Sequence, residues 1–263
     1  MNAKPDSSAL LEIARDTALG AARQIRPAHR HVVEDLSRDV KIEADRRLHQ
    51  IITDLLESRS ALPILSEEDE GSILPGLSAG RVWVVDPLDG SLNFSRGIPF
   101  CGISIGLWSS EGPVLGVIHD FQRNELFSGA VGGGAFLNGS PISVSMIDQK
   151  EKAILCTGFP TGADFSHDAV SNLVTDIQSF KKVRWLGSAA LSLAYVAAGR
   201  ADVYQENGIA LWDVAAGLAL VQAAGGTVSI TRTTVPHRFS VRAGSPGLVR
   251  GGVFQKSTEV SHA

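Results

Sequence analysis

The chain has 263 residues, of which 44% are hydrophobic and 20% are charged, a balance that excludes an intrinsically disordered protein. The formal net charge is -4, from 24 basic and 28 acidic residues, so we do not expect a surface built to bind a nucleic acid polymer or an anionic membrane. The only two cysteines, Cys101 and Cys156, lie far apart in the sequence, which argues against a disulfide framework and a cysteine-built zinc site.

Two segments bear on localisation. Residues 1–8 are polar and lack the apolar core of a secretory signal. The longest apolar-rich stretch, 208–226, is interrupted by Asp213 and Gln222, which is not typical of a membrane-spanning helix. We therefore expect a soluble, cytoplasmic protein with no membrane partner.

In the first half of the chain, two helical patterns precede a series of strands. Residues 6–8 offer N-caps to an apolar stripe that stops before Pro27, and a second stripe predicts a helix over about 42–58. The pattern then changes to short runs rich in valine and isoleucine, bounded by glycine or proline, which predict strands. These predicted strands cover 62–65, 81–85, 102–108, 114–119 and 125–130, with turns at 131–134 and 138–141.

The second half alternates between strands and helices. Strands are predicted over 153–157, 183–186 and 201–205, and helices over 164–180, 188–198 and 211–224. No repeat or long linker interrupts the chain, so we predict one unit over residues 1–263. Its two halves would meet near residue 145, an α+β half at 1–145 with most of the candidate ligands and an α/β half at 146–263.

Four acidic stretches, 43–45, 66–70, 86–91 and 212–213, are candidates for chemistry. Asp86 ends an apolar strand, and a carboxylate at that place needs a partner because an unpaired buried charge is costly. Pro87 stiffens the turn, so that Asp86 and Asp89 can converge with the carbonyl of Leu88 pointing the same way. Hard oxygen ligands of this kind are those that Mg²⁺ accepts.

Each acidic stretch also has a plainer interpretation when it is taken alone. Asp89-Gly90 is a common hairpin turn, and Asp213 can simply cap the helix that follows it. The cluster at 67–70 can be solvated surface, as most Glu and Asp residues are. These alternatives remain open for any single stretch.

Other catalytic templates fit less well. The spacing after Asp86 fails the EF-hand pattern, and the chain has neither a P-loop nor a His-Glu-x-x-His zinc helix. The segment 102–106 does match the Gly-x-Ser-x-Gly elbow of serine hydrolases around Ser104. That elbow must join a strand to a helix, whereas this segment lies inside a predicted strand followed by a turn at 109–112. A serine hydrolase is therefore a weak alternative.

Taken together, three blocks resemble the signatures of the inositol monophosphatase family, a superfamily of Mg²⁺-dependent, lithium-sensitive phosphatases. The superfamily also includes fructose-1,6-bisphosphatases and bisphosphate nucleotidases. The blocks are Ser66-Glu67-Glu68, residues 86–94 and residues 212–217, in the family's order, within a resemblance that spans residues 39–226. The resemblance implies a layered αβαβα sandwich, phosphomonoesterase activity and a homodimer.

The resemblance also implies a site that holds two or three Mg²⁺ ions. Metal ligands carried over by position are Glu67, Asp86, the carbonyl of Leu88, Asp89 and Asp213. Catalytic roles fall on Glu67, on Asp45, which would assist a third ion through water, and on Ser91, which replaces the family's threonine and would position the nucleophilic water. The segment from Gly90 would open a short helix whose N–H groups receive the phosphate.

The same comparison points to a substrate class. Substrate contacts carried over by position are Asp89, Gly90, Ser91, Ala189, Glu206 and Asp213. The turn 187–190 and Glu206 resemble the hydroxyl-binding parts of inositol and sugar phosphatases, so we expect a small polyol or sugar phosphate as substrate. The turn lacks the lysine of the Gly-Ser-Ser-Leu-Lys stretch in bisphosphate nucleotidases.

Two alternatives to this substrate class stay open. A 3′(2′),5′-bisphosphate nucleotidase is one. The other is a regulatory or binding protein that kept the fold and lost turnover, because a fold does not determine a function. Lys41-Ile42 stands where the family often has Val-Thr, a departure with no assigned role.

Overall fold

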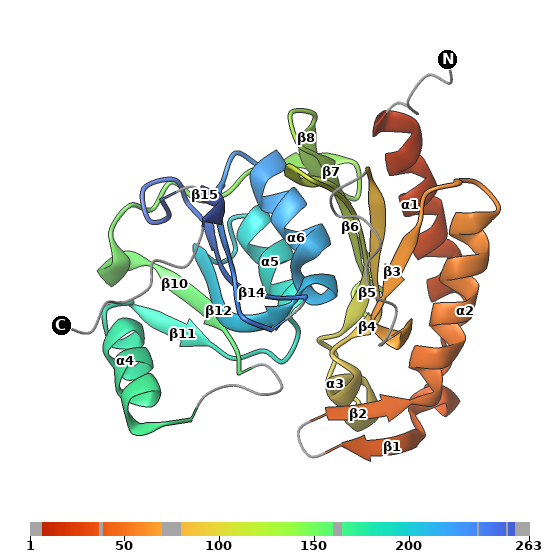
Figure 1. The fold of residues 1–263 in the computed structure, drawn as a ribbon, viewed down its shortest axis with the longest axis horizontal. Coiled ribbons are helices and arrows are strands. Elements are labelled where there is room, and N and C mark those ends of the chain that lie inside the picture. The colour runs from red at the N-terminus through yellow and green to blue at the C-terminus, as the bar shows by residue number, and fades with distance from the viewer. Residues whose placement is uncertain are drawn as a thin grey trace.

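Helices and sheets alternate in five layers across the molecule (Figure 1). The computed structural model describes residues 7–36, 39–69, 80–159, 165–235, 237–250 and 252–255. Helices α1 and α2 cover one face of a seven-stranded sheet, α5 and α6 fill the space between the two sheets, and α4 lies outside the second sheet (Figure 1). The predicted first N-cap candidate, Asp6, lies outside the described residues.

The outer layer beside the first sheet consists of α1 (Ser7–Ala22) and α2 (Glu43–Glu57), both predicted from their apolar stripes. Buried side chains of the two helices pack with residues of the sheet, such as Trp83 and Ile105, in one hydrophobic cluster. The chain between the helices forms a 3₁₀ turn (Pro27–Arg30) and a hairpin, β1 (Val32–Leu36) with β2 (Asp39–Ile42), which the sequence analysis did not predict.

The first sheet contains seven strands in chain order, from β3 to β9. Its members are β3 (Ile64–Ser66), β4 (Val82–Asp89), β5 (Gly102–Ser109), β6 (Gly112–Asp120), β7 (Glu125–Ala130), β8 (Gly134–Leu137) and β9 (Ser140–Ile142). Only β3 and β4 pair in parallel, and the short helix α3 (Ser91–Arg96) leaves the end of β4. The last two strands were not predicted, because only turns at 131–134 and 138–141 were expected in this region.

The second sheet is mixed and has the order β11-β10-β12-β14-β13-β15. Its strands are β10 (Ile154–Thr157), β11 (Lys182–Arg184), β12 (Val203–Ala210), β13 (Thr227–Arg232), β14 (Arg238–Gly244) and β15 (Gly252–Gln255). Its helices are α4 (His167–Gln178), α5 (Ala189–Ala197) and α6 (Leu211–Ala223). The last three strands were not predicted, and β12 extends beyond the predicted end at Gln205 because it bulges and pairs again with β14 up to Ala210.

Helix α6 is packed on both sheets, and glycine makes its close approach possible. Gly106 and Gly116 face one another across β5 and β6. A Cβ atom on Gly116 would stand 2.1 Å from the carbonyl oxygen of Ala216 in α6, so no larger residue fits without moving the helix. This packing places the first turn of α6, which carries Asp213, against the first sheet.

In the part of the chain that the structure describes, none of the helices has the length and apolar character needed to cross a membrane.

Candidate active site

Three carboxylates from three separate elements converge at one end of the first sheet. Ligand oxygens of Glu67, Asp86 and Asp213 all lie within 4.8 Å of one another. Ser66 of β3 pairs with Val85 of β4, so the next residues along these parallel strands, Glu67 and Asp86, lie side by side. Asp213 comes from the first turn of α6. The three residues predicted as metal ligands from distant parts of the sequence therefore form one cluster.

This cluster carries strong electrostatic repulsion in the absence of a cation. Burial, together with the charges of Glu67, Asp89, Asp213 and Asp45, raises the pKa of Asp86 well above its usual range. Burial and the charges of Glu67 and Asp89 likewise raise the pKa of Asp213. Buried carboxylates in this number need positive charge to be stable as anions, and hard oxygen donors suit Mg²⁺. The residues present therefore fit a divalent cation.

The side chain of Asp86 holds the backbone that directly follows it. Asp86 Oδ1 accepts a hydrogen bond from the backbone N–H of Leu88 at 3.0 Å. The carbonyl oxygen of Leu88, also a predicted ligand, lies 2.8 Å from the Ser91 hydroxyl oxygen. These short-range contacts shape the end of β4, which bulges between Asp86 and Asp89, and the start of α3 at Ser91.

Asp45 and Ser91 are brought together from two helices. The Ser91 hydroxyl lies 2.7 Å from Asp45 Oδ1, while Asp45 Oδ2 accepts the backbone N–H of Ile42 at 2.6 Å. Asp45 is buried, and this second bond caps the start of α2. The pair thus joins the beginning of α2 to the beginning of α3, beside Asp86.

Asp89 lies outside the group of three, and its contacts come from the other half of the chain. Its Oδ2 accepts the Ser188 hydroxyl at 2.5 Å and the backbone N–H of Ala190 at 2.6 Å. Burial raises the pKa of Asp89 to about 6, although these hydrogen bonds oppose the rise. One oxygen of the Asp89 carboxylate is therefore held by protein donors.

Glu206 is a buried residue of β12 at the strand's bulge, and not the residue after a strand as predicted. The hydroxyl of Tyr204 donates to Glu206 Oε2 at 2.7 Å. Burial raises the pKa of Glu206 to about 7. A Cβ atom on Gly158 would stand 2.7 Å from the same oxygen, so the carboxylate lies against the backbone of the segment after β10. The charge of Glu206 also contributes to the raised pKa of Asp213, so the two carboxylates interact electrostatically.

Two further predicted contacts are backbone positions. Gly90 has φ of 87°, and a Cβ atom there would stand 2.9 Å from the carbonyl oxygen of Phe100. This left-handed conformation and close packing require glycine. Ala189 is the first residue of α5, directly after Ser188, whose hydroxyl caps that helix by accepting from the N–H of Leu191 at 3.2 Å.

Comparison with known proteins assigns this arrangement to a family. A family model described as the inositol monophosphatase family matches residues 5–258. The chain belongs to the inositol monophosphatase family. An inositol-1-monophosphatase from Synechocystis is 37% identical over 235 residues, which cover 85% of this chain and 79% of that protein. The Nus factor SuhB of Xylella fastidiosa is 38% identical over 232 residues, which cover 86% of this chain and 82% of that protein.

Solved structures of the inositol monophosphatase family share the fold. The inositol monophosphatase of Anabaena superimposes with a TM-score of 0.76 at 32% identity and covers 92% of each chain. The 2'AMP-bound SaIMPase-II gives a TM-score of 0.77 at 26% identity and covers 92% of this chain and 90% of that one. The αβαβα sandwich predicted from the sequence is confirmed, and family membership supports a phosphatase of the superfamily.

The geometry of the family site includes residues that the sequence analysis did not single out. The donors from Ser188 and Ala190 to Asp89 were missed, because the turn 187–190 was interpreted only as a substrate contact. The bond from Tyr204 to Glu206 was missed as well. The signal for it was present, since residues two apart on a strand project to the same face.

The alternative of a serine hydrolase finds no support in the fold. Ser104 lies in the middle of β5, is fully buried and pairs in register with Asp86 of β4. A nucleophile elbow needs an exposed hydroxyl at a junction between a strand and a helix. Ser104 has neither property.

Proposed function

We propose that the protein is a Mg²⁺-dependent phosphomonoesterase that hydrolyses a small polyol or sugar phosphate. The observation that carries the proposal is the convergence of Glu67, Asp86 and Asp213 within 4.8 Å, in a chain of a phosphatase family. The paired Asp45 and Ser91 stand beside this cluster and add the groups that a hydrolytic reaction needs.

The carboxylate cluster would hold the metal ions. Glu67, Asp86 and the carbonyl of Leu88 would bind a first ion, and Asp86, Asp89 and Asp213 a second, with Asp45 assisting a third through water. Bound divalent cations neutralise the charge of a phosphate ester and lower the pKa of water. The charge repulsion among these carboxylates supports the assignment, because a cation relieves it.

Ser91 would orient the nucleophilic water. Its hydroxyl has one hydrogen, and both of its close neighbours, Asp45 Oδ1 and the carbonyl of Leu88, are acceptors. The hydroxyl therefore donates to one of them, and its lone pairs are available to accept a hydrogen bond from water. Asp45 in turn is held by the start of α2, so the orientation is set before substrate binds.

The substrate's leaving group would lie toward Glu206. The buried carboxylate, held by Tyr204, suits the hydroxyls of a polyol, which are hydrogen-bond donors. It also disfavours a second phosphate through like charge. The phosphate itself would meet Asp89, Gly90, Ser91, Ala189 and Asp213 from the loop after β4 and the first turns of α5 and α6.

A panel of phosphorylated metabolites, assayed with Mg²⁺ and with EDTA, tests this function. Hydrolysis of a sugar or inositol phosphate that stops in EDTA and returns with Mg²⁺ is the expected result. Full activity in EDTA would contradict the metal mechanism. A chain that folds, binds Mg²⁺ and turns over no phosphate ester would instead support the regulatory alternative, toward which the relatives named Nus factor SuhB point.

A second substrate class has a specific observation in its favour. Phe159, directly after Gly158, has its ring centroid 5.3 Å from that of Trp185 and 5.0 Å from that of Phe165. All three rings are exposed, with Trp185 at 55%. Such a cluster beside Glu206 suits stacking with a nucleobase, and the relative SaIMPase-II binds 2'AMP.

The two substrate classes separate in one experiment. We propose to measure kcat/KM for inositol 1-phosphate and for adenosine 3′,5′-bisphosphate in the wild type and in Trp185→Ala. A preference of the wild type for the bisphosphate that Trp185→Ala removes would make this chain a 3′(2′),5′-bisphosphate nucleotidase. A preference for the inositol phosphate, unchanged in the variant, supports the polyol class.

We further propose that the protein is a cytoplasmic homodimer. The molecule that it binds would be a small phosphorylated metabolite, and not a nucleic acid polymer or a membrane.

A further inference from the structure

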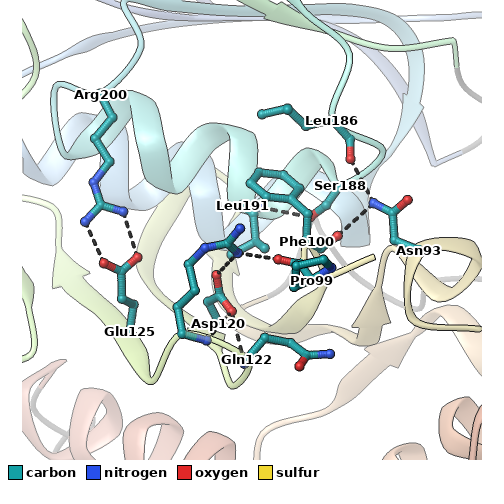
Figure 2. A network of polar contacts seen from close by, with 11 residues as sticks. Asn93, Pro99, Phe100, Asp120, Gln122, Glu125, Leu186, Ser188, Leu191 and Arg200 are labelled. Carbon is teal, nitrogen blue, oxygen red and sulfur yellow. Dashed lines mark hydrogen bonds and ion pairs between the residues drawn. The ribbon is translucent and has the colours of Figure 1, made fainter. Parts of the chain in front are cut away.

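Asn93 in α3 makes a set of contacts that the proposed reaction does not use. Its Nδ2 lies 2.8 Å from the carbonyl oxygen of Phe100 and 2.8 Å from that of Leu186 (Figure 2). It also lies 3.3 Å from the carbonyl oxygen of Gly187. An amide nitrogen has two hydrogens, so it serves two of these carbonyls fully and the third weakly. Because every neighbour is an acceptor, only the NH₂ end of the amide can occupy this place.

The three carbonyls belong to two segments that are far apart in the sequence. Phe100 precedes β5 in the first sheet, whereas Leu186 and Gly187 form the turn before α5. Asn93 itself follows Asp89 by one turn of chain, inside α3. One side chain therefore joins the metal-ligand loop, the start of β5 and the turn before α5.

The backbones at this junction touch directly. A Cβ atom on Gly187, where φ is 75°, would stand 2.9 Å from Asn93 Nδ2. A Cβ atom on Gly90 would stand 3.2 Å from the carbonyl oxygen of Gly187. The end of β4 and the turn before α5 thus meet closely, and Asn93 bonds them together alongside the contacts of Asp89.

The start of β5 is itself anchored from a second side. The guanidinium of Arg123 donates to the carbonyl of Pro99 and, at 2.8 Å, to Asp120 Oδ2, and it lies over the ring of Phe100. The carbonyl of Phe100 is consequently a fixed point. By bonding to it, Asn93 locates the turn before α5 relative to the first sheet.

The residues that follow this turn hold Asp89. Ser188 and Ala190 donate to Asp89 Oδ2 at 2.5 Å and 2.6 Å. Their distance from Asp89 depends on where the turn lies, and a small displacement would break both bonds. We propose that Asn93 is a positioning residue, which fixes the turn before α5 so that Ser188 and Ala190 orient Asp89 toward the metal ions. The inference rests on the proposed function, because Asp89 is a metal ligand only there.

The test compares two asparagines that both bridge segments. In Asn93→Ala the bonds to Phe100 and Leu186 are lost. The matched control is Asn138→Ala, in which the turn between β8 and β9 loses its bonds to Leu126 of β7 and to Asn124 in the turn before β7. Both variants remove a structural amide, but only the first one lies at the junction with Asp89. Asn93→Gln, which keeps the amide but displaces its NH₂ group by one methylene, replaces Asn93→Ala if that variant does not fold.

The experiment measures three quantities in each variant: Mg²⁺ affinity by calorimetry, the rise in Tm that Mg²⁺ induces, and the kinetic constants. In Asn93→Ala we expect Mg²⁺ affinity and kcat each to fall about tenfold or more, as for other residues that orient metal ligands, with little change in KM for substrate. Asn138→Ala should lose Tm without losing Mg²⁺ affinity. A normal Mg²⁺ affinity and kcat in Asn93→Ala would overturn the inference alone, whereas a wild type without Mg²⁺ binding would overturn the proposed function and the inference together.

Discussion

Ser91 and Asp45 form a hydrogen bond of 2.7 Å between the first turns of two different helices. The other oxygen of Asp45 caps α2 through the N–H of Ile42, at 2.6 Å. The orientation of the Ser91 hydroxyl is therefore tied to the point at which α2 begins. A residue that stabilises a helix start also positions the hydroxyl to which the proposed reaction gives a catalytic role.

Replacing Ser91 tests the role of this hydroxyl. Ser91→Ala removes the group that orients water, so we expect kcat to fall about a hundredfold, in the range seen when a proton-transfer or positioning group is lost. Ser91→Thr keeps the hydroxyl and should retain most of the activity. Steady-state kinetics on the best substrate measures both. Equal loss in the two variants would show that the side chain's shape matters and its hydroxyl does not.

Asp213→Asn tests the repulsion within the carboxylate cluster. Removing one charge from a cluster in which the pKa of Asp86 and Asp213 is raised should stabilise the metal-free protein, with a Tm gain of about 3 °C or more in EDTA at pH 7.5. The same variant should gain less Tm from Mg²⁺ than the wild type and lose nearly all turnover. Differential scanning calorimetry with and without Mg²⁺ gives the comparison. A variant less stable than the wild type in EDTA contradicts the electrostatic account.

Asp89→Asn should also lose turnover, but its Tm in EDTA should change less than that of Asp213→Asn. The carboxylate of Asp89 accepts hydrogen bonds from Ser188 and Ala190, and these hydrogen bonds oppose the rise in the pKa of Asp89. Losing the charge therefore relieves repulsion and weakens two bonds at once. The contrast between the Tm values of Asp89→Asn and Asp213→Asn, both measured in EDTA, checks this difference.

The raised pKa of Glu206 predicts a pH-dependent difference in stability between the wild type and Glu206→Gln. This pKa rises on folding from 4.5 to about 7, so ionisation opposes folding, and the native state loses stability as pH rises through this interval. Glu206→Gln removes that loss while it keeps an acceptor for Tyr204. In EDTA, the two proteins should have similar stability near pH 5, and the variant should be more stable by roughly 3 kcal/mol at pH 8. Urea unfolding across this range measures it, and a constant difference would contradict the shift.

Gly116→Ala tests the packing of α6 on the first sheet. A Cβ atom would stand 2.1 Å from the carbonyl oxygen of Ala216, and helix backbone cannot move aside cheaply. We expect destabilisation of about 3 kcal/mol or more, together with weaker Mg²⁺ binding, because α6 carries Asp213. Gly80→Ala is the control, since a Cβ atom there meets nothing within 4 Å. Equal stability of the two variants would mean that the contact is not required.

Ser104→Ala separates the serine hydrolase alternative from the metal mechanism. Ser104 is fully buried in β5, and its Oγ has no hydrogen-bond partner among the described residues. The substitution should leave turnover unchanged and keep or slightly raise stability, because an unsatisfied buried hydroxyl is removed. Loss of turnover in Ser104→Ala, with full activity in Asp89→Asn, would reverse the assignment.

Local patterns in the chain were enough to predict most of the elements that carry the site. The apolar stripes of α1 and α2 and the valine-rich run of β4 are strong signals, because one face or the whole of each element is buried. The hairpin of β1 and β2 was missed because residues 32–42 include several charged side chains and show no apolar alternation. The strands β13 and β14 were not predicted, although apolar and polar side chains alternate along both of them.

The sequence by itself determined which residues could serve the site, since Asp86, Pro87 and Asp89 follow one buried strand and shape a single local turn. Only the tertiary structure decided how distant groups meet. The packing of α6 against Gly116 brings Asp213 to Asp86, and the bonds of Asn93 bring Ser188 to Asp89. The physical reason is that a turn depends on neighbours in the chain, whereas the distance between remote segments depends on how whole helices and sheets pack.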